Sequence, residues 1–167
     1  IESELFGHER GAFTDAVTAR VGRFELARAG TVYLDAVNEL PLEAQSKLLR
    51  IVEEKRVERL GGQMSVAMEA RVVASSGADI EDAVREGRFR QDLFHRLRVL
   101  PLLVPPLRDR RDDVVPLARY FAARAVAAEK RTPPAFSRDA AEALRDYAWP
   151  GNVRELRHVV EISCQTA

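Results

Sequence analysis

Short apolar runs predict the strands of a sheet in the first part of the chain. Residues 31–35 (TVYLD) are apolar and β-branched, follow Gly30 and end in Asp35, which predicts a central strand of a parallel sheet, buried on both faces. Residues 70–75 predict a second buried strand, and residues 99–104, followed by two prolines, predict a third. Residues 56–71 alternate around Gly61-Gly62 and predict a hairpin.

Apolar positions at helical spacing predict helices between these runs. Pro41 is expected in the first turn of a helix that packs on the sheet through four apolar positions, Leu42, Leu48, Leu49 and Val52. Asp79 is expected to cap a helix over residues 80–86. Residues 88–97 predict an amphipathic helix, because apolar residues recur there at every fourth position: Phe89, Leu93 and Leu97.

The last part of the chain is alanine-rich and predicts three helices. The first covers residues 112–130, with Leu117, Tyr120, Phe121 and Val126 on one side. The second runs from a cap at Ser137 to residue 147, and the third follows a tight turn at residues 149–152, with Asn152 as its cap. The pattern therefore predicts an α/β subdomain over residues 1–110, followed by a small all-helical subdomain over residues 111–167.

Composition and charge narrow the class of protein. Lys+Arg and Asp+Glu number 26 each, so the net charge is zero and no global basic field recruits nucleic acid. Cys164 is the single cysteine, which excludes an internal disulfide and fits a reducing compartment. No apolar run reaches the length of a membrane span and no signal peptide opens the chain, so we expect a cytoplasmic protein without a membrane partner. The abrupt helical start predicts a fragment of a longer domain.

Two positions carry candidate chemistry on the pattern alone. Asp35 ends the first strand, and in open α/β sheets ligands bind outside the carboxyl ends of the strands. An aspartate there often holds a nucleotide-bound Mg²⁺ through water, and the alternative is a turn or helix-cap residue. Phe13 lies in a polar stretch and has no apolar partners at strand or helix spacing. This predicts an exposed loop tip that contacts a partner. The alternative for Phe13 is that it folds back onto the core.

Six separate stretches resemble one family in order and spacing: residues 4–9 (ELFGHE), 11–16 (GAFTDA), 30–40, 87–97, 105–111 and 149–156 (WPGNVREL). Together they resemble the central AAA+ ATPase domain of bacterial enhancer-binding proteins, the activators of sigma-54 RNA polymerase. The resemblance covers essentially the whole chain. It implies a partial AAA+ P-loop-type parallel sheet flanked by helices, followed by a helical lid. The Walker A loop of the family lies upstream of the GAFTGA segment, and no GxxxxGK[ST] occurs in these residues.

The resemblance implies a role for the loop and for the strand end. The loop would contact the sigma factor with Phe13 and Thr14 at its tip, and it consists of Gly11, Ala12, Phe13, Thr14, Asp15 and Ala16. Asp35 would be the Walker B aspartate, which holds Mg²⁺ through water and so helps to bind ATP.

Three arginines match positions that act on ATP in the family. Arg90 and Arg96 would be arginine fingers that reach the ATP of a neighbouring subunit, and the alternative is that both form surface salt bridges. Arg154 would be the sensor II residue of the lid. The implied partners are sigma-54 with RNA polymerase and further copies of the chain in a hexameric ring. DNA would be contacted only through a domain that is not present here.

The sequence departs from the family pattern at three functional positions. Ala36 stands where the Walker B glutamate would orient the attacking water, and Glu39 is poorly placed to replace it. Loss of a positioned general base typically costs a factor of roughly 10²–10⁴ in rate. Gly77 stands where the family has its sensor I asparagine. Asp15 replaces a glycine of the loop, which removes a permissive backbone site and adds a charge at the tip.

These observations support two functions of different classes. One is a fragment of an ATP-dependent transcriptional regulator that remodels sigma-54 RNA polymerase through the GAFTGA-like loop. The other is a hydrolysis-deficient AAA+ module that serves as a nucleotide-sensing or assembly scaffold. In one form of this second function, the module acts independently of sigma-54. A third, an unrelated α/β binding domain, requires the spaced motifs to be coincidence. The 167 residues alone are expected to bind ATP weakly or not at all and to be inactive as an ATPase.

Overall fold

The computed structural model describes residues 1–77, 79–127 and 131–166. It consists of two compact units, residues 1–101 and 102–167, each of which has its own hydrophobic core. The two units are described separately below.

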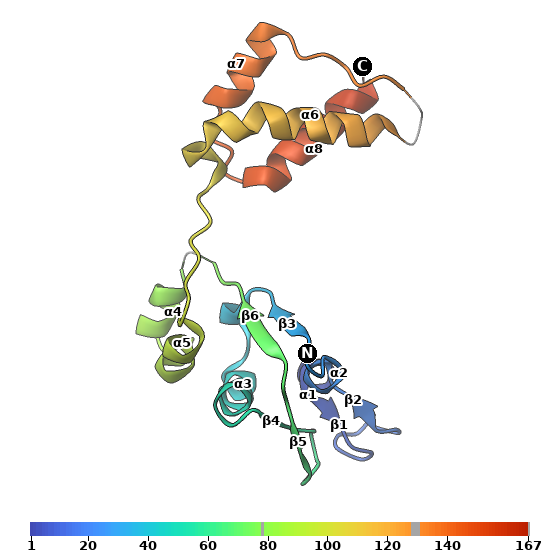
Figure 1. The fold of residues 1–167 in the computed structure, drawn as a ribbon, viewed down its shortest axis with the longest axis vertical. Coiled ribbons are helices and arrows are strands. Elements are labelled where there is room, and N and C mark those ends of the chain that lie inside the picture. Colours follow the sequence, from blue (N-terminus) through green and yellow to red (C-terminus); the bar gives the residue numbers. More distant parts are fainter. Residues whose placement is uncertain (78, 128–130, 167) are drawn as a thin grey trace. The chain divides into compact units, whose positions relative to one another are not determined.

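The N-terminal unit alternates short strands with helices (Figure 1). Its elements are, in chain order, α1 (Glu2–Phe6), β1 (Gly7–His8), β2 (Arg20–Val21), α2 (Arg23–Leu26), β3 (Thr31–Leu34), the 3₁₀ turn η1 (Val37–Glu39), α3 (Leu42–Glu54), β4 (Arg56–Glu58), β5 (Ser65–Ala67), β6 (Arg71–Ala74), α4 (Ile80–Arg85) and α5 (Gln91–Leu97).

Three strand pairs organise this unit. β3 and β6 are parallel, with Leu34 opposite Ala74, so the carboxyl ends of both strands lie at the same edge. β4 and β5 form the antiparallel hairpin that the Gly61-Gly62 signal predicted, and β1 pairs with β2. The parallel pair flanked by helices confirms the predicted α/β class.

The predictions that residues 31–35 are buried on both faces and that residues 70–75 form a second buried strand are wrong about burial. Val32 and Leu34 of β3 point into the core, whereas Thr31 and Tyr33 face outward. The residue Tyr33 is 61% exposed. No residue of β6 is fully buried. The reason is that side chains alternate along a strand, and the described residues supply core packing to only one face of this pair.

The prediction of a third strand over residues 99–104 is also wrong. This stretch has no regular structure, and its apolar side chains from Val99 to Val104 are 72–95% exposed. A strand needs a neighbour for its backbone hydrogen bonds, and no described strand pairs with these residues.

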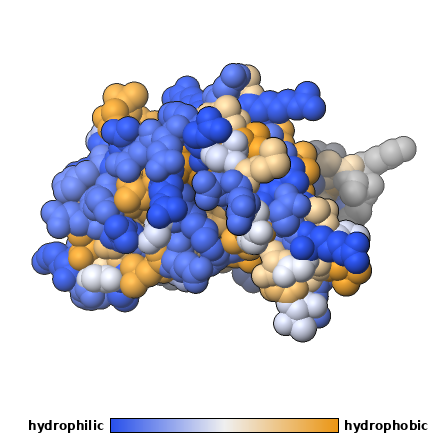
Figure 2. All heavy atoms as spheres, turned by 90° about the horizontal axis from the view of Figure 1, so that it is seen from below, coloured by the Kyte–Doolittle hydropathy of each residue, from blue (hydrophilic) through white to orange (hydrophobic). Residues whose placement is uncertain are grey.

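Figure 2 shows hydrophobic side chains dispersed among hydrophilic ones over one face.

Helix α3 is central to the core of the N-terminal unit. Ala44, Leu48 and Ile51 of α3 are buried and pack with Phe89 and Leu93, which confirms the apolar stripe expected at residues 88–97. Leu49 and Val52 are partly buried, whereas Leu42 is exposed, contrary to its expected place on the packed side. Asp79 precedes α4, but its side chain makes no cap hydrogen bond.

All the regular elements in the described part of the C-terminal unit are helices or 3₁₀ turns. It consists of the 3₁₀ turns η2 (Leu107–Asp109) and η3 (Arg111–Asp113) and the helices α6 (Val114–Ala127), α7 (Arg138–Asp146) and α8 (Asn152–Thr166), of which α6 and α8 pack together. Ser137 caps α7 as predicted, because its hydroxyl accepts a hydrogen bond from the Ala140 N–H. The expected continuation of the first helix over residues 128–130 lies outside the described residues.

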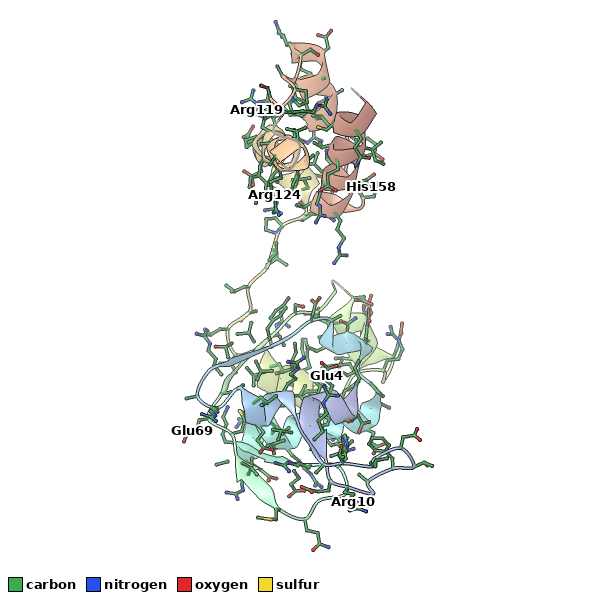
Figure 3. All side chains as sticks on the ribbon, turned by 90° about the vertical axis from the view of Figure 1, so that its right-hand side faces the viewer. Glu4, Arg10, Glu69, Arg119, Arg124 and His158 are labelled. Atoms are coloured by element: carbon green, nitrogen blue, oxygen red, sulfur yellow. The ribbon has the colours of Figure 1, made fainter. Side chains whose placement is uncertain are left out.

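The buried side of α6 differs in part from the predicted one. Phe121 and Val126 are buried and Leu117 is partly buried, but Tyr120 is exposed, next to Arg124 on the same helix. Figure 3 shows Arg119 and Arg124 on α6 and His158 on α8. None of the helices in the described residues is long and apolar enough to cross a membrane.

Candidate functional site

Asp35 lies at the carboxyl end of β3, directly beside the end of β6. The parallel register places Ser75 next to it, and the Ser75 hydroxyl donates a 2.6 Å hydrogen bond to Asp35 Oδ1. The Tyr33 hydroxyl donates to the same oxygen at 3.3 Å. These donors hold an exposed carboxylate in place at the edge where α/β sheets bind ligands. We call Asp35, Asn38, Ser75 and Gly77 the strand-end site.

Ala36 follows Asp35 with its backbone in the left-handed region, at φ 53° and ψ 52°. This conformation costs a non-glycine residue about 1–2 kcal/mol. It is held by the Ser75 hydroxyl, which accepts the Ala36 N–H at 3.2 Å, and by the Ser75 carbonyl, which accepts the Val37 N–H at 2.9 Å. The position therefore has a fixed backbone, but its methyl side chain can neither accept a proton nor orient a water.

Asn38 connects the loop after β3 to the loop after β6. The Gly77 N–H donates to Asn38 Oδ1 at 3.3 Å. Glu39, the next residue, is exposed at the end of η1. Sequence reasoning identified Gly77 but missed Asn38; the signal that could have found it is a carboxamide three residues after the strand-end aspartate.

The oxygen donors of the strand-end site fit Mg²⁺ in the form expected for a nucleotide-bound ion. Mg²⁺ in such sites usually keeps several waters and takes one or two carboxylates plus the phosphates. Asp35 supplies one carboxylate, with the Ser75 hydroxyl beside it. No group of three or more metal-binding side chains gathers among the described residues, so a metal held by protein ligands alone has no support.

Arg90 is held at the start of α5 by interactions within its own unit. Its guanidinium forms an ion pair with Asp92 at 2.7 Å and donates to the Ser46 hydroxyl at 3.1 Å. The hydrogen bond from Arg90 lowers the pKa of the Asp92 carboxyl below its usual value. The exposed pair is weak, so Arg90 can exchange Asp92 for another anion at little cost.

Gln45 of α3 fixes the backbone around Arg90, a contact that sequence reasoning missed. Its side chain is fully buried, its amide donates to the carbonyls of Leu40 (2.7 Å) and Arg88 (3.0 Å), and its Oε1 accepts the Arg90 N–H at 2.8 Å. All the polar atoms of this buried side chain are used: two of its contacts hold the segment that presents Arg90, and the third holds the Leu40 carbonyl before α3.

Replacing Gln45 with leucine is expected to lower the free energy of unfolding of the N-terminal unit by roughly 2–4 kcal/mol, because three backbone groups lose their buried partner. Urea unfolding of the full chain would measure the loss. Gln63 is exposed in the hairpin turn, and Gln63→Leu serves as the matched control with little expected change. Equal stability of the two variants would contradict the role given to Gln45.

Arg96 and Arg98 differ although both lie near the end of α5. Arg96 is exposed, and no ion pair joins it to another described residue. Arg98 forms an ion pair with Glu81 at 2.8 Å and its guanidinium lies over the Phe94 ring. The interpretation of Arg96 as a residue in a surface salt bridge thus has no support among the described residues, whereas Arg98 is engaged with partners of its own unit.

The predicted contact loop, residues 11–16, closes on itself between β1 and β2. The Gly11 N–H donates to the Ala16 carbonyl at 2.8 Å, and the Ala16 N–H donates to the Phe13 carbonyl at 2.9 Å. Thr14 and Asp15 are exposed, Ala16 is buried, and Ala12 is partly buried. Position 15 lies outside the left-handed region, so the aspartate there brings a charge without backbone strain.

Phe13 combines features of both interpretations of its sequence. Its ring packs edge-on against the buried His8 at a centroid distance of 5.0 Å, yet 44% of the residue is exposed. His8 is itself fixed by a 2.7 Å hydrogen bond between its Nδ1 and the Ser3 hydroxyl. The loop tip therefore presents an aromatic surface that is supported from below.

Arg59 of the hairpin anchors the loop, through contacts that sequence reasoning missed. It pairs with Glu9 at 3.0 Å and donates two hydrogen bonds to the carboxylate of Glu25, whose pKa is lowered by them. The hairpin turn lies against the loop, since a Cβ on Gly61 would come within 2.8 Å of the Ala12 Cβ. Figure 3 shows Arg10, the residue directly before this loop.

The tight turn before α8 positions Arg154 in the C-terminal unit. The buried Trp149 donates its indole N–H to the Leu144 carbonyl at 2.7 Å. Asn152 does not cap α8 through its side chain as predicted, because its Oδ1 accepts the Leu107 N–H at 2.7 Å. The Glu155 carboxylate accepts the Gly151 N–H instead. Arg154, in the first turn of α8, is exposed.

Comparison with known proteins decides the family. The model of the sigma-54 interaction domain matches residues 1–103, and that of the AAA+ ATPase lid domain matches residues 108–167. The chain belongs to the sigma-54 interaction domain family. Both the family and the AAA+ fold that the spaced motifs predicted are therefore confirmed.

Relatives with a sigma-54 interaction domain are transcription regulators. The chain is 47% identical over 161 residues to the DNA-binding transcriptional activator HyfR of Escherichia coli K12, covering 96% of this chain and 24% of HyfR. It is 47% identical over 163 residues to the Nif-specific regulatory protein of Klebsiella pneumoniae, covering 98% of this chain and 31% of that protein. The chain thus spans well under half of these relatives.

Solved structures agree with the family. NtrX from Brucella abortus, 38% identical, superposes with a TM-score of 0.90 over 99% of this chain and 37% of NtrX. Crystal structures of NtrX in complex with ADP and with ATP each give a TM-score of 0.88, over 36% and 35% of NtrX.

Proposed function

We propose that the chain is the ATP-binding and sigma-54-contacting part of a bacterial transcription activator, which works in the cytoplasm on sigma-54 RNA polymerase. The observation that carries the proposal is the fixed Asp35 carboxylate at the carboxyl end of the parallel pair, in a chain of the sigma-54 interaction domain family. Asp35 binds ATP through Mg²⁺ and its waters. Residues upstream of this chain supply the phosphate-binding loop.

Residues 11–16 make the contact to sigma-54. Phe13 is the anchor, since a half-exposed aromatic on a supported loop offers apolar area at little ordering cost. The Arg59 anchor keeps the base of the loop fixed on the hairpin. The loop is therefore largely ordered before it binds its partner.

The expected result for Phe13→Ala, made in a full-length protein that carries this chain, is a sigma-54 affinity lower by about 30-fold, the size of an interface hot spot. The measurement is equilibrium binding of purified sigma-54 with ATP and Mg²⁺ present. Tyr120→Ala, which removes an exposed aromatic of the C-terminal unit, is the matched control. If Phe13→Ala left sigma-54 binding intact while ATP binding persisted, the loop would lose the role assigned to it.

Arg90 and Arg96 act on the ATP of a neighbouring subunit in a hexameric ring. Arg96 is exposed, and Arg90 is held by a weak exposed ion pair with Asp92 and one hydrogen bond to Ser46, so both guanidinium groups can reach an anion outside their own subunit. Arg154, in the first turn of α8, is the sensor II residue of the lid. DNA is contacted by a domain outside this chain.

Ala36 favours a second candidate, in which the module binds ATP but hydrolyses it slowly and serves as a nucleotide-sensing or assembly scaffold. The family pattern has at this position a carboxylate that activates water, and the methyl group of Ala36 cannot do so. The two candidates share the ATP site. Ala36 makes slow turnover the expected result for the full-length protein, and a rapid ATPase rate would remove the second candidate.

A further inference from the structure

We infer that Asn38 is the residue that recognises the terminal phosphate of a nucleoside triphosphate, a role that rests on the proposed ATP site and adds a specificity-determining residue to it. Its carboxamide lies on the first turn after Asp35 and bridges to the end of β6. No motif of the sequence assigns this residue a function.

The direction of the Asn38 side chain follows from hydrogen bonding. The group that faces it is the Gly77 N–H, which can only donate, so the Asn38 atom at 3.3 Å must be the carbonyl oxygen Oδ1. The amide nitrogen Nδ2 therefore points away from that contact. It donates no hydrogen bond to another described residue, and the residue is only partly buried.

The space beside Gly77 is bordered by the Asn38 amide and by the Asp79 carboxylate. A Cβ on Gly77 would lie 3.9 Å from Asn38 Nδ2 and would collide with the exposed Asp79 carboxylate. Residue 77 has no side chain, so the amide nitrogen of Asn38 is the polar group that borders this space on the side of β3. The strand-end site thus presents a carboxylate on Asp35 and an N–H donor on Asn38 at the same edge.

This pairing fits a metal-bound phosphate rather than a bare cation. The carboxylate of Asp35 suits the hydrated metal. The amide N–H of Asn38 is neutral and donates a hydrogen bond to a phosphate oxygen. Asp35 and Asn38 are three residues apart, and the loop that carries both is joined to the loop after β6, at Ala36 through Ser75 and at Asn38 through Gly77. A phosphate bound next to the metal of Asp35 is the acceptor assigned to the amide. A diphosphate lacks the group that this donor would bind, and Asn38 therefore favours ATP over ADP.

The test is the ratio of ATP and ADP affinities of a full-length protein that carries this chain, measured by calorimetry with Mg²⁺ present. Asn38→Asp keeps an acceptor for the Gly77 N–H, and so keeps the loop, but replaces the donor with a negative charge. It is expected to weaken ATP binding by roughly 10- to 100-fold, the value of a hydrogen bond to a charged group, while ADP binding changes little. Asn38→Ala is expected to weaken ATP binding in the same direction.

Gln63→Glu, the same amide-to-acid change in the exposed hairpin turn, is the control and is expected to leave both affinities unchanged. An Asn38→Asp protein that binds ATP and ADP like the unmodified one overturns the role of Asn38 and leaves the ATP site standing. An unmodified protein that binds neither nucleotide overturns the proposed function itself, and the role of Asn38 with it.

Discussion

Replacing Ala36 with glutamate is expected to raise the ATP turnover of a full-length protein that carries this chain by a factor of roughly 10²–10⁴. The backbone at position 36 is held by Ser75 on two sides, so a longer side chain starts from a defined point next to Asp35. The new carboxylate would accept a proton from the attacking water, which a methyl group cannot do. Phosphate release under saturating ATP is the measurement.

Ala36→Gln is the matched control for this prediction. Glutamine has the size of glutamate but is not a base at neutral pH, so its turnover is expected to stay near that of the unmodified protein. Rapid ATP turnover by the unmodified protein, or equal gains in turnover from glutamine and glutamate, would show that Ala36 does not limit hydrolysis. The first outcome would also remove the scaffold candidate.

The second large effect concerns Arg96. In the Ala36→Glu background, Arg96→Ala is expected to lower turnover by about 10³-fold or more, because an arginine finger stabilises the charge that develops on the transferred phosphate. Arg98→Ala is the control on the same helix. Arg98 is engaged with Glu81 and Phe94, so its loss is expected to change stability more than turnover.

Mixing experiments test whether Arg96 acts on a neighbour. Subunits with Ala36→Glu and Arg96→Ala contain the base but no finger, whereas unmodified subunits contain the finger but no base. Neither is expected to hydrolyse ATP rapidly alone, and a mixture of the two is expected to recover part of the lost rate. Without recovery in mixed assemblies, Arg96 would not be a finger that serves another subunit.

Local sequence pattern predicted the elements of the fold well and their burial poorly. The hairpin around Gly61-Gly62, the cap at Ser137 and the stripe of Phe89 and Leu93 depend on residues close in sequence. The outward Tyr33 and the irregular residues 99–104 depend on which strands lie alongside them. An apolar run indicates what a segment can form, but its neighbours determine whether it is paired and buried.

The candidate site shows the same division. The position of Asp35 at the end of a strand could be predicted because the end of the apolar run is visible in the sequence. The groups that hold or complete the site come from far along the chain, as with Ser75 on Asp35 and Gln45 on Arg90. Such pairs have no periodic signal, since they depend on the register of β3 with β6 and on the packing of α3 against α5.

The central claim is that Asp35 marks an ATP site in which binding persists and hydrolysis is slow. Its most direct test is to measure ATP affinity and ATP turnover on one preparation of the full-length protein, with Mg²⁺ and with the ion removed by a chelator. We predict ATP binding that depends on Mg²⁺, together with turnover near background. Binding that is absent or indifferent to Mg²⁺, or rapid turnover by the unmodified protein, would contradict the claim.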